Sequence, residues 1–347
     1  MTTIDIDNEP EGFRIELVVS DGNYSITITG YDRNKEKMVI PESFAGISVT
    51  AIHSHAFMGN KNLRSVIIPE GLTTIGFSAF AGCYNLVYIR LPQSLITIES
   101  SAFQNCKKLK RISFPEGLID IGDNIFYGCK NLQEIDVDED NPVYASEDGV
   151  LFDKHRTTLI AYPKGKERAY KIPDSVIDIE HRAFEACEEL TQIIISQNLL
   201  SLTHKSRFYG CKHLSDIIVS KNNPVFTDID GVLFNKEKTE LIQYPQGKIN
   251  DNYIVPDTVT RIGAGAFYQS KLLYNITLPE GIKFIGDYAF GECEQLTAIY
   301  LPQSLQYIGK CAFGGCAHLT TIKLSRKTKM GYKAFEGFQG NWLIYRD

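Results

Sequence analysis

A phenylalanine recurs every 23 residues over two long stretches of this chain. The positions that keep this spacing are Phe57, Phe80, Phe103 and Phe126 in the first stretch, and Phe267, Phe290 and Phe313 in the second. Each belongs to a longer pattern, which is clearest from Leu63 to Cys83: Leu-x-x-Val-x-Ile-Pro-x-Gly-Leu-x-x-Ile-Gly-x-x-Ala-Phe-x-Gly-Cys. A fixed period of this length indicates a solenoid, in which each coil contacts only its neighbours. The chain is therefore predicted to be a stack of coils.

One coil is too small to bury its apolar side chains alone, so they must pack against their counterparts in the next coil. The residues predicted to form the core of one coil are Leu63, Val66, Ile68, Leu72, Ile75 and Phe80. The Leu-x-x-Val-x-Ile-Pro stretch predicts a short parallel strand that ends at the proline, because proline cannot donate a hydrogen bond to a sheet. The Leu-x-x-Ile-Gly stretch predicts a second strand on the opposite wall, and Ala-Phe a tight or helical turn. We expect a mostly β fold with little helix.

The repeat resembles the BspA-like leucine-rich repeats of bacterial surface proteins, and the resemblance covers nearly the whole chain after about residue 35. It implies a right-handed leucine-rich repeat solenoid with short parallel strands, used for binding or adhesion at the cell surface. It supplies no family-wide catalytic residues, so we expect no enzymatic activity and no cofactor. The first twenty residues carry five acidic side chains and no apolar run of signal-peptide length. Two locations stay open: the cell surface or outside the cell, if a leader has been removed, and the cytoplasm.

The solenoid is predicted to have a cap at each end. Residues 13–19 and 24–31 alternate apolar and polar side chains across Ser20-Asp21-Gly22-Asn23, which predicts a β-hairpin. Because a solenoid end exposes an apolar coil, we assign residues 1–36 as an N-terminal β-hairpin cap and residues 37–347 as the solenoid. A C-terminal cap is placed at about residues 336–347, where the only tryptophan lies.

Two interruptions break the regular spacing of the phenylalanines. The interval from Phe126 to Phe184 and the interval from Phe208 to Phe267 are each roughly two and a half times the regular spacing. Both intervals contain Asn-Pro-Val, Asp-Gly-Val-Leu-Phe and Tyr-Pro, and each motif is displaced between its two copies by the same offset that separates Phe126 from Phe208. We infer that a block of this length was duplicated whole.

The inserted segments lie at about residues 138–170 and 220–253. In each insert two short apolar runs flank a polar turn, which predicts a hairpin. The paired runs are 150–152 with 159–162 and 232–234 with 241–244.

Seven of the eight cysteines stand three residues after a repeat phenylalanine. They are Cys83, Cys106, Cys129, Cys187, Cys211, Cys293 and Cys316. Equivalent side chains of stacked coils point in parallel and not toward each other, so we expect a column of buried thiols rather than disulfides. Asn60 and Ser270 fill the same position in other coils. This exchange fits a hydrogen-bonding turn and does not fit a zinc site, whose ligands must converge on one point.

The charge of the chain argues against a nucleic-acid partner. Lysine and arginine number 36 against 42 acidic residues, which gives a net charge of −6. Phosphate contacts need a basic surface. No stretch approaches the roughly 20 apolar residues of a membrane-spanning helix. We expect a monomer with a protein or glycan ligand.

One short motif is similar to the nucleophile motif of haloacid-dehalogenase phosphatases. It runs from Asp228 to Leu233 and reads Asp-Ile-Asp-Gly-Val-Leu. The duplicated copy has Ser146 in place of the first aspartate, and no apolar strand leads into either copy. We interpret the motif as the entry to a hairpin, with Asp-Gly in the turn.

A second motif matches part of a calcium-binding loop. Asp136, Asp138, Asp140 and Glu147 fall at its positions 1, 3, 5 and 12. Position 6 is Asn141 where the loop requires glycine, and the duplicated copy has lost the acidic residues. We favour a solvated acidic turn and no metal site, with calcium binding as the open alternative.

The positions that vary between coils are the candidate binding residues, because the repeat fixes the core and leaves them free. They flank the buried residue of each strand and point outward, and we call this surface the strand face. Its candidate residues are Tyr88, Arg90, Arg111, Ser113, Glu134, Asp136, Gln192, Asp216, Asn275, Tyr300 and Lys323. Tyrosine and arginine often dominate the energy of protein interfaces, so a protein ligand is favoured.

Two alternatives remain beside this hypothesis. Phe284 and Tyr307 occupy equivalent exposed positions on the opposite wall and form a second candidate surface. The other alternative is a passive structural spacer with no dedicated ligand, for which a uniformly polar surface is expected.

Overall fold

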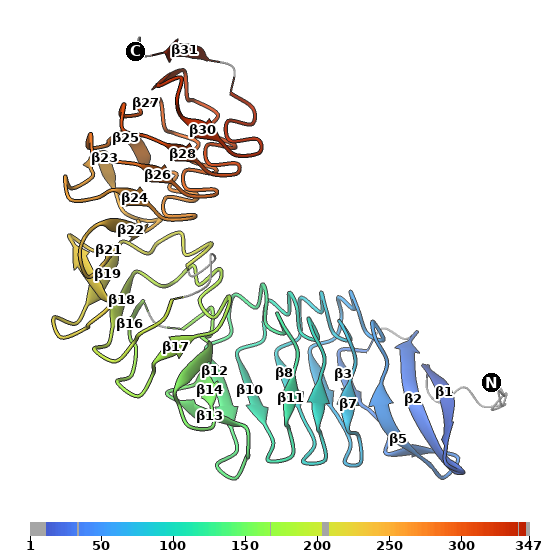
Figure 1. The fold of residues 1–347 in the computed structure, drawn as a ribbon. Coiled ribbons are helices and arrows are strands. Elements are labelled where there is room, and N and C mark those ends of the chain that lie inside the picture. The colour runs from blue at the N-terminus through green and yellow to red at the C-terminus, as the bar shows by residue number, and fades with distance from the viewer. Residues whose placement is uncertain (1–11, 33–34, 167, 203–207, 339, 345–347) are drawn as a thin grey trace. The chain divides into compact units, whose positions relative to one another are not determined.

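The computed structural model describes residues 12–32, 35–166, 168–202, 208–338 and 340–344 (Figure 1). The chain forms two compact units, Met1–Lys166 and Glu167–Asp347. Within the described ranges the regular structure is strand and turn, and none of these residues is helical. The described part of the chain therefore has no helix that could cross a membrane. These features confirm the predicted mostly β solenoid, and the Ala-Phe segment is a tight turn and not a helical one.

In the first unit the coils carry two series of parallel strands (Figure 1). The strand-face series contains β3 (Lys37–Val39), β6 (Ser65–Ile67), β8 (Tyr88–Arg90), β10 (Arg111–Phe114) and β12 (Glu134–Val137). The second series contains β5 (Ile47–Ile52), β7 (Thr74–Ile75), β9 (Thr97–Ile98) and β11 (Asp120–Ile121), with β4 (Ser43–Phe44) antiparallel to β5. Val66 pairs with Ile89 and Ile75 with Ile98, so the register matches the sequence repeat.

The second unit repeats this arrangement. Its strand-face series contains β16 (Ala169–Lys171), β18 (Gln192–Ile195), β19 (Asp216–Val219), β23 (Asn250–Ile254), β25 (Leu273–Thr277), β27 (Ala298–Tyr300), β29 (Thr321–Leu324) and β31 (Asn341–Ile344). Its second series contains β17 (Asp178–Ile179), β24 (Arg261–Ile262), β26 (Phe284–Ile285), β28 (Tyr307–Ile308) and β30 (Lys329–Met330). Strand partners again lie one coil apart, as in the pairing of Ile285 with Ile308.

The predicted N-terminal hairpin is formed by β1 (Phe13–Ser20) and β2 (Asn23–Tyr31), which pair antiparallel. Strand β2 also pairs in parallel with β5, so the hairpin continues the second series of strands. Residues 1–11 and 33–34 of the predicted cap lie outside the described residues, as do 339 and 345–347 of the C-terminal one. The capping role of both ends stays a prediction.

Each insert contains the predicted hairpin and one strand more. The first is formed by β13 (Tyr144–Glu147), β14 (Val150–Asp153) and β15 (Thr158–Ala161), and the second by β20 (Phe226–Ile229), β21 (Val232–Asn235) and β22 (Glu240–Gln243). Neighbouring strands of each set are antiparallel. The extra residues therefore form a three-stranded meander. In the second insert its last strand, β22, pairs in parallel with β24 and so joins the second series.

A column of stacked aromatic rings forms the centre of each core. In the second unit the ring centroids of Phe267 and Phe290 are 4.9 Å apart and those of Phe290 and Phe313 are 5.0 Å apart, with planes within 11° of parallel. Tyr244 extends this column, since its ring stacks on Phe267 at 5.0 Å. Tyr244 lies 23 residues before Phe267 and so takes the place of a repeat phenylalanine, which the motif did not predict because the residue is a tyrosine.

The turn around Ala-Phe forms a third wall of hydrogen bonds between coils. Alternate backbone N–H groups donate to carbonyls of the next coil, with N–O distances of 2.7–2.9 Å in the first such set. Those donors are His55, Phe57 and Gly59. Within this turn residues take positive φ angles to make the geometry, for example Ser78 at 52° and Gly82 at 73°.

All eight cysteines are free and buried, which confirms the predicted thiol column. Thiols donate to the backbone carbonyl of the phenylalanine 26 residues earlier, with Sγ–O distances of 3.0–3.3 Å. These donors are Cys83, Cys106, Cys129, Cys293 and Cys316. Burial raises the pKa of the Cys129 thiol to about 12, so it stays protonated and unreactive at neutral pH.

The stacking predicts that core phenylalanines differ in importance according to the number of stacked neighbours. Phe290 is fully buried between two rings, so Phe290→Ala should cost about 3–5 kcal/mol. Phe335 is only partly buried and lies at the end of the column, where it stacks on Phe313, so Phe335→Ala should cost much less. Denaturant midpoints followed by circular dichroism measure the difference, and equal losses for the two variants would contradict the stacking account.

Ser270 predicts a stabilising substitution. It occupies a thiol position, but its buried hydroxyl has no hydrogen-bond partner. The carbonyl that a thiol would use, that of Tyr244, accepts a bond from Gln243 Nε2 at 2.9 Å. Because an unpaired buried hydroxyl is unfavourable, Ser270→Ala should stabilise the protein by about 1 kcal/mol. Cys293→Ser is the control and should destabilise. Calorimetric melting temperatures test both, and a lower value for Ser270→Ala would refute the prediction.

Candidate binding surface

Strand geometry places the candidate residues on the strand face. Successive side chains of a strand point to opposite sides. The middle residue of each strand is buried, as Ile89 and Ile299 show, and its neighbours project outward. Tyr88 and Tyr300 are 51% and 60% exposed. Arg90, Arg111, Ser113 and Asn275 are also exposed, whereas the remaining candidates, Glu134, Asp136, Gln192, Asp216 and Lys323, are half-buried. The role of all these residues in binding remains a prediction.

The parallel register sets equivalent outward residues side by side. In the first unit Arg111 pairs with Glu134 and Ser113 with Asp136. Tyr88 and Arg90, on β8, pair with Ser65 and Ile67 on β6. Strand β8 also neighbours β10, so the surface changes from aromatic and basic to acidic across three coils.

Arg111 is held by ion pairs to the acidic end of this surface. Its Nε donates to Glu134 Oε2 at 2.7 Å and lies 3.6 Å from Asp136 Oδ2, and a second guanidinium nitrogen also contacts Glu134. Partial burial and the Glu134 carboxylate raise the pKa of Asp136, and the Arg111 guanidinium opposes this rise. A ligand that uses Arg111 must therefore compete with, or complement, these two carboxylates.

In the second unit the candidates fall into two groups on the strand face. Gln192 pairs with Asp216, whose carboxylate lies 3.6 Å from the ammonium of Lys248. The other group contains Tyr300, which pairs with Lys323.

Asn275 belongs to the same group as Tyr300, because its strand β25 pairs with β27. Its side-chain oxygen accepts a hydrogen bond from Thr297 Oγ1 at 3.3 Å. Within this group Tyr300 presents the largest exposed apolar surface of the candidates.

The insert turns border the strand face, a position that the sequence pattern did not predict. The carbonyl of Gly149 accepts a bond from the Ile135 N–H at 2.9 Å, and the carbonyl of Gly231 accepts one from Ile217 at 2.9 Å. Gly149 has a φ of 69°, and a side chain there would lie 2.8 Å from Glu134 Cγ. Only glycine fits this close approach.

The phosphatase-like motif has a structural role in this border. Asp228 Oδ1 accepts a hydrogen bond from the Val219 N–H at 2.8 Å. In the other copy Ser146 Oγ accepts the equivalent bond from Val137 at 3.0 Å. Asp228 and Ser146 thus accept equivalent backbone hydrogen bonds. Their equivalent positions in the two copies of the block were the sequence signal for this structural role.

The calcium-like turn is built around a buried asparagine. Asn141 is fully buried, and its Nδ2 donates to the carbonyls of Pro115 at 2.9 Å and Leu118 at 2.8 Å. In the second copy Asn223 Nδ2 likewise donates to two carbonyls, those of Ser196 at 2.8 Å and Leu199 at 2.9 Å. Among the residues that the structure describes, no three His, Cys, Asp or Glu side chains are grouped closely enough to hold a metal ion.

The second candidate surface is less open than the sequence suggested. Phe284 and Tyr307 pair across β26 and β28. Phe284 is half-buried, and the guanidinium of Arg261 lies 4.8 Å from the centroid of its ring. Of this pair only Tyr307 is exposed.

Comparison with known proteins identifies the repeat. A family model described as the BspA type leucine rich repeat region matches in six copies, over residues 31–146, 166–254 and 248–341. No curated protein matches the chain significantly.

Three solved structures are similar to the chain to different degrees. The pneumococcal vaccine antigen PcpA is 22% identical, with 93% of this chain and 76% of that chain covered and a TM-score of 0.53. A leucine rich cell surface protein from Faecalibacterium prausnitzii is 23% identical, with coverages of 92% and 96% and a TM-score of 0.49. A leucine-rich repeat protein from Bacteroides ovatus is 21% identical, with coverages of 99% and 100% and a TM-score of 0.37. The first of these supports the fold.

The ion pairs on the first unit predict opposite pKa changes for two variants. Arg111→Gln should raise the pKa of Asp136 further, and Glu134→Gln should lower it. A raised pKa means that the folded state holds the proton more tightly, so the stability linked to Asp136 is lost as pH rises from the ordinary value through the raised one. Carbon NMR titration of the Asp136 carboxyl group measures both changes. The same direction of shift in both variants would contradict the assignment.

Proposed function

The chain belongs to the BspA-type leucine-rich repeat family, and from this premise we propose that it is a non-catalytic binding scaffold whose strand face recognises a protein ligand. The observation that carries the proposal is the contrast between core and face. The repeat keeps the buried strand residues apolar, whereas their outward neighbours differ in charge, size and aromaticity from coil to coil. A spacer would need no such variety.

The first unit holds the main anchor of the proposed interface. Tyr88 and Arg90 are both exposed and lie on one short strand, two residues apart. Tyrosine supplies a large rigid contact area, and arginine supplies directional hydrogen bonds. The carboxylates of Glu134 and Asp136 lie two coils away, so the proposed partner presents acidic groups to Arg90 and basic groups to the acidic end.

We place the protein at the cell surface as part of the same proposal. Support comes from the family, whose repeats this chain shares with bacterial surface proteins. A scaffold exposed to the surroundings can carry a long, varied face toward a partner without a catalytic centre.

Paired substitutions test the proposed surface. Tyr88→Ala with Arg90→Ala should weaken binding to the partner at least tenfold, which corresponds to about 1.4 kcal/mol per tenfold change. The melting temperature should stay nearly unchanged, because both side chains are exposed. The partner is first identified by crosslinking to the intact protein, and its affinity is then measured by biolayer interferometry.

The control changes Ile96 and Thr97 to alanine, in the same coil: Thr97 lies on β9 of the second series, and Ile96 directly precedes it. This control should keep full affinity. If it loses as much affinity as the Tyr88 and Arg90 variant, the strand face is not the specific surface. If affinity falls only when the hairpins at 150–162 or 232–244 are altered, the inserts form the binding element instead.

A further inference from the structure

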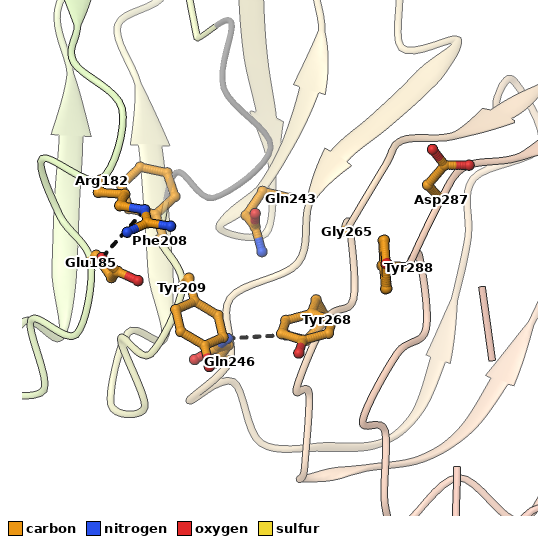
Figure 2. A pocket seen from close by; sticks show the side chains of 10 residues that line it. All are labelled: Arg182, Glu185, Phe208, Tyr209, Gln243, Gln246, Gly265, Tyr268, Asp287 and Tyr288. Atoms are coloured by element: carbon orange, nitrogen blue, oxygen red, sulfur yellow. Dashed lines mark hydrogen bonds and ion pairs between the residues drawn. The ribbon is translucent and has the colours of Figure 1, made fainter. Parts of the chain in front are cut away.

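The second unit contains a cavity that the strand face does not use. Its volume is about 370 Å³, at the small end of the range for ligand pockets. Figure 2 shows its lining residues, which come from several coils. The cavity joins three tyrosines, two glutamines and a few charged groups, so its walls are partly aromatic and partly polar.

The tyrosine rings form one side of the cavity. The centroids of Tyr209 and Tyr268 are 5.6 Å apart with planes tilted by 37°, and those of Tyr268 and Tyr288 are 6.4 Å apart with planes nearly perpendicular. Tyr268 is half-buried between the other two. This side therefore offers an aromatic surface.

The glutamines supply buried amide groups. Gln243 and Gln246 are each 7% exposed. Gln246 Nε2 donates to the carbonyl of Tyr268 at 3.0 Å, but Gln246 Oε1 has no donor among the described residues. A buried acceptor without a donor is unfavourable, and a hydroxyl or N–H group of a ligand would supply one.

The charged groups of the cavity are largely held by the protein itself. Arg182 Nε lies 3.8 Å from the carboxylate of Glu185, whose side chain is only 8% exposed. Asp287 Oδ1 accepts a hydrogen bond from the Lys310 N–H at 2.9 Å. Because Arg182 is already paired with Glu185, the cavity disfavours an anionic ligand. Hydroxyl groups of a ligand can still form hydrogen bonds with Arg182, Glu185 and Asp287.

The duplicated block provides an internal comparison. The residues of the first copy that correspond to Tyr209 and Gln246 are Tyr127 and Lys164. Lys164 is buried, and its ammonium lies 5.8 Å from the centroid of the Tyr127 ring. In the first copy a lysine thus covers the ring, whereas in the second copy a shorter amide leaves the equivalent ring facing a cavity.

We infer that this cavity binds a neutral sugar ring of a glycan, with Tyr268 as the stacking surface and Gln246 as a hydrogen-bond acceptor for a hydroxyl group. A sugar ring has one face of C–H groups and an edge of hydroxyls. The cavity offers a matching aromatic side and polar side. Its volume suits one or two rings, so it recognises the end of a glycan.

The test uses ligand-observed saturation-transfer NMR with the full chain. The probes are methyl glycosides of the common neutral hexoses and N-acetylhexosamines, with sialic acid as an anionic probe and tetramethylammonium as a cationic probe. At least one neutral glycoside should show transfer to its ring protons. No signal from any neutral glycoside, or a signal from an ionic probe alone, would overturn the proposal.

Variants locate the binding at the cavity. Gln246→Lys introduces the residue of the first copy, and it should weaken binding at least tenfold while the fold tolerates it as it does there. Tyr268→Ala should have a similar effect. Tyr127→Ala is the matched control in the first unit and should change nothing. Equal loss in this control would overturn the assignment of the site.

This inference does not depend on the proposed protein-binding surface. Tyr88 and Arg90 lie in the first unit, and their variant should keep full glycoside binding. If glycoside binding survives Gln246→Lys but is lost in the Tyr88 and Arg90 variant, the sugar binds on the strand face, and the proposal that the cavity binds it is refuted. Loss of partner binding alone would concern only the strand face.

Discussion

Contact between equivalent groups of adjacent coils holds each unit together. Rings of the second unit stack at about 5 Å, and the strands and turns of each coil bond to the next one. The stacked core and the backbone hydrogen bonds of a coil thus both depend on the same neighbouring coil. Adding residues within a coil would shift both at once. This explains why the added residues form meanders, and why the second meander rejoins the second series through β22 and the ring column at Tyr244.

The core of this fold could be predicted from sequence because a constant spacing marks each stacked position. The wall of turns could not. Its left-handed residues include Ser78 and Tyr288, whose side chains give no sign of a positive φ. Tyr244 was missed for a different reason: it keeps the regular spacing of 23 residues to Phe267, but the residue at that position is a tyrosine and not a phenylalanine. Ser270 resembled a cysteine equivalent, yet the carbonyl it would use is taken by Gln243.

The candidate sites, too, could be predicted from the sequence only where a regular spacing sets the position. Strand alternation was enough to place Tyr88 and Tyr300 outside. It could not show that Arg111 is engaged with two carboxylates, because ion pairs depend on side-chain conformations between coils. The cavity in the second unit was not predicted at all. Its tyrosines and glutamines share no motif, and only the packing of separate coils brings them together.

The duplicated block also bears on how such a chain changes over generations. It runs from one Phe-Tyr-Gly-Cys, at Phe126, to the next, at Phe208, and so begins and ends at the same point of a coil. Unequal recombination between the two copies would add or remove a whole block without changing the local fit at either junction. The length of the chain can therefore change by whole blocks from one generation to the next without disrupting the core. One copy can keep the ancestral residues while the other acquires new ones, as Lys164 and Gln246 illustrate.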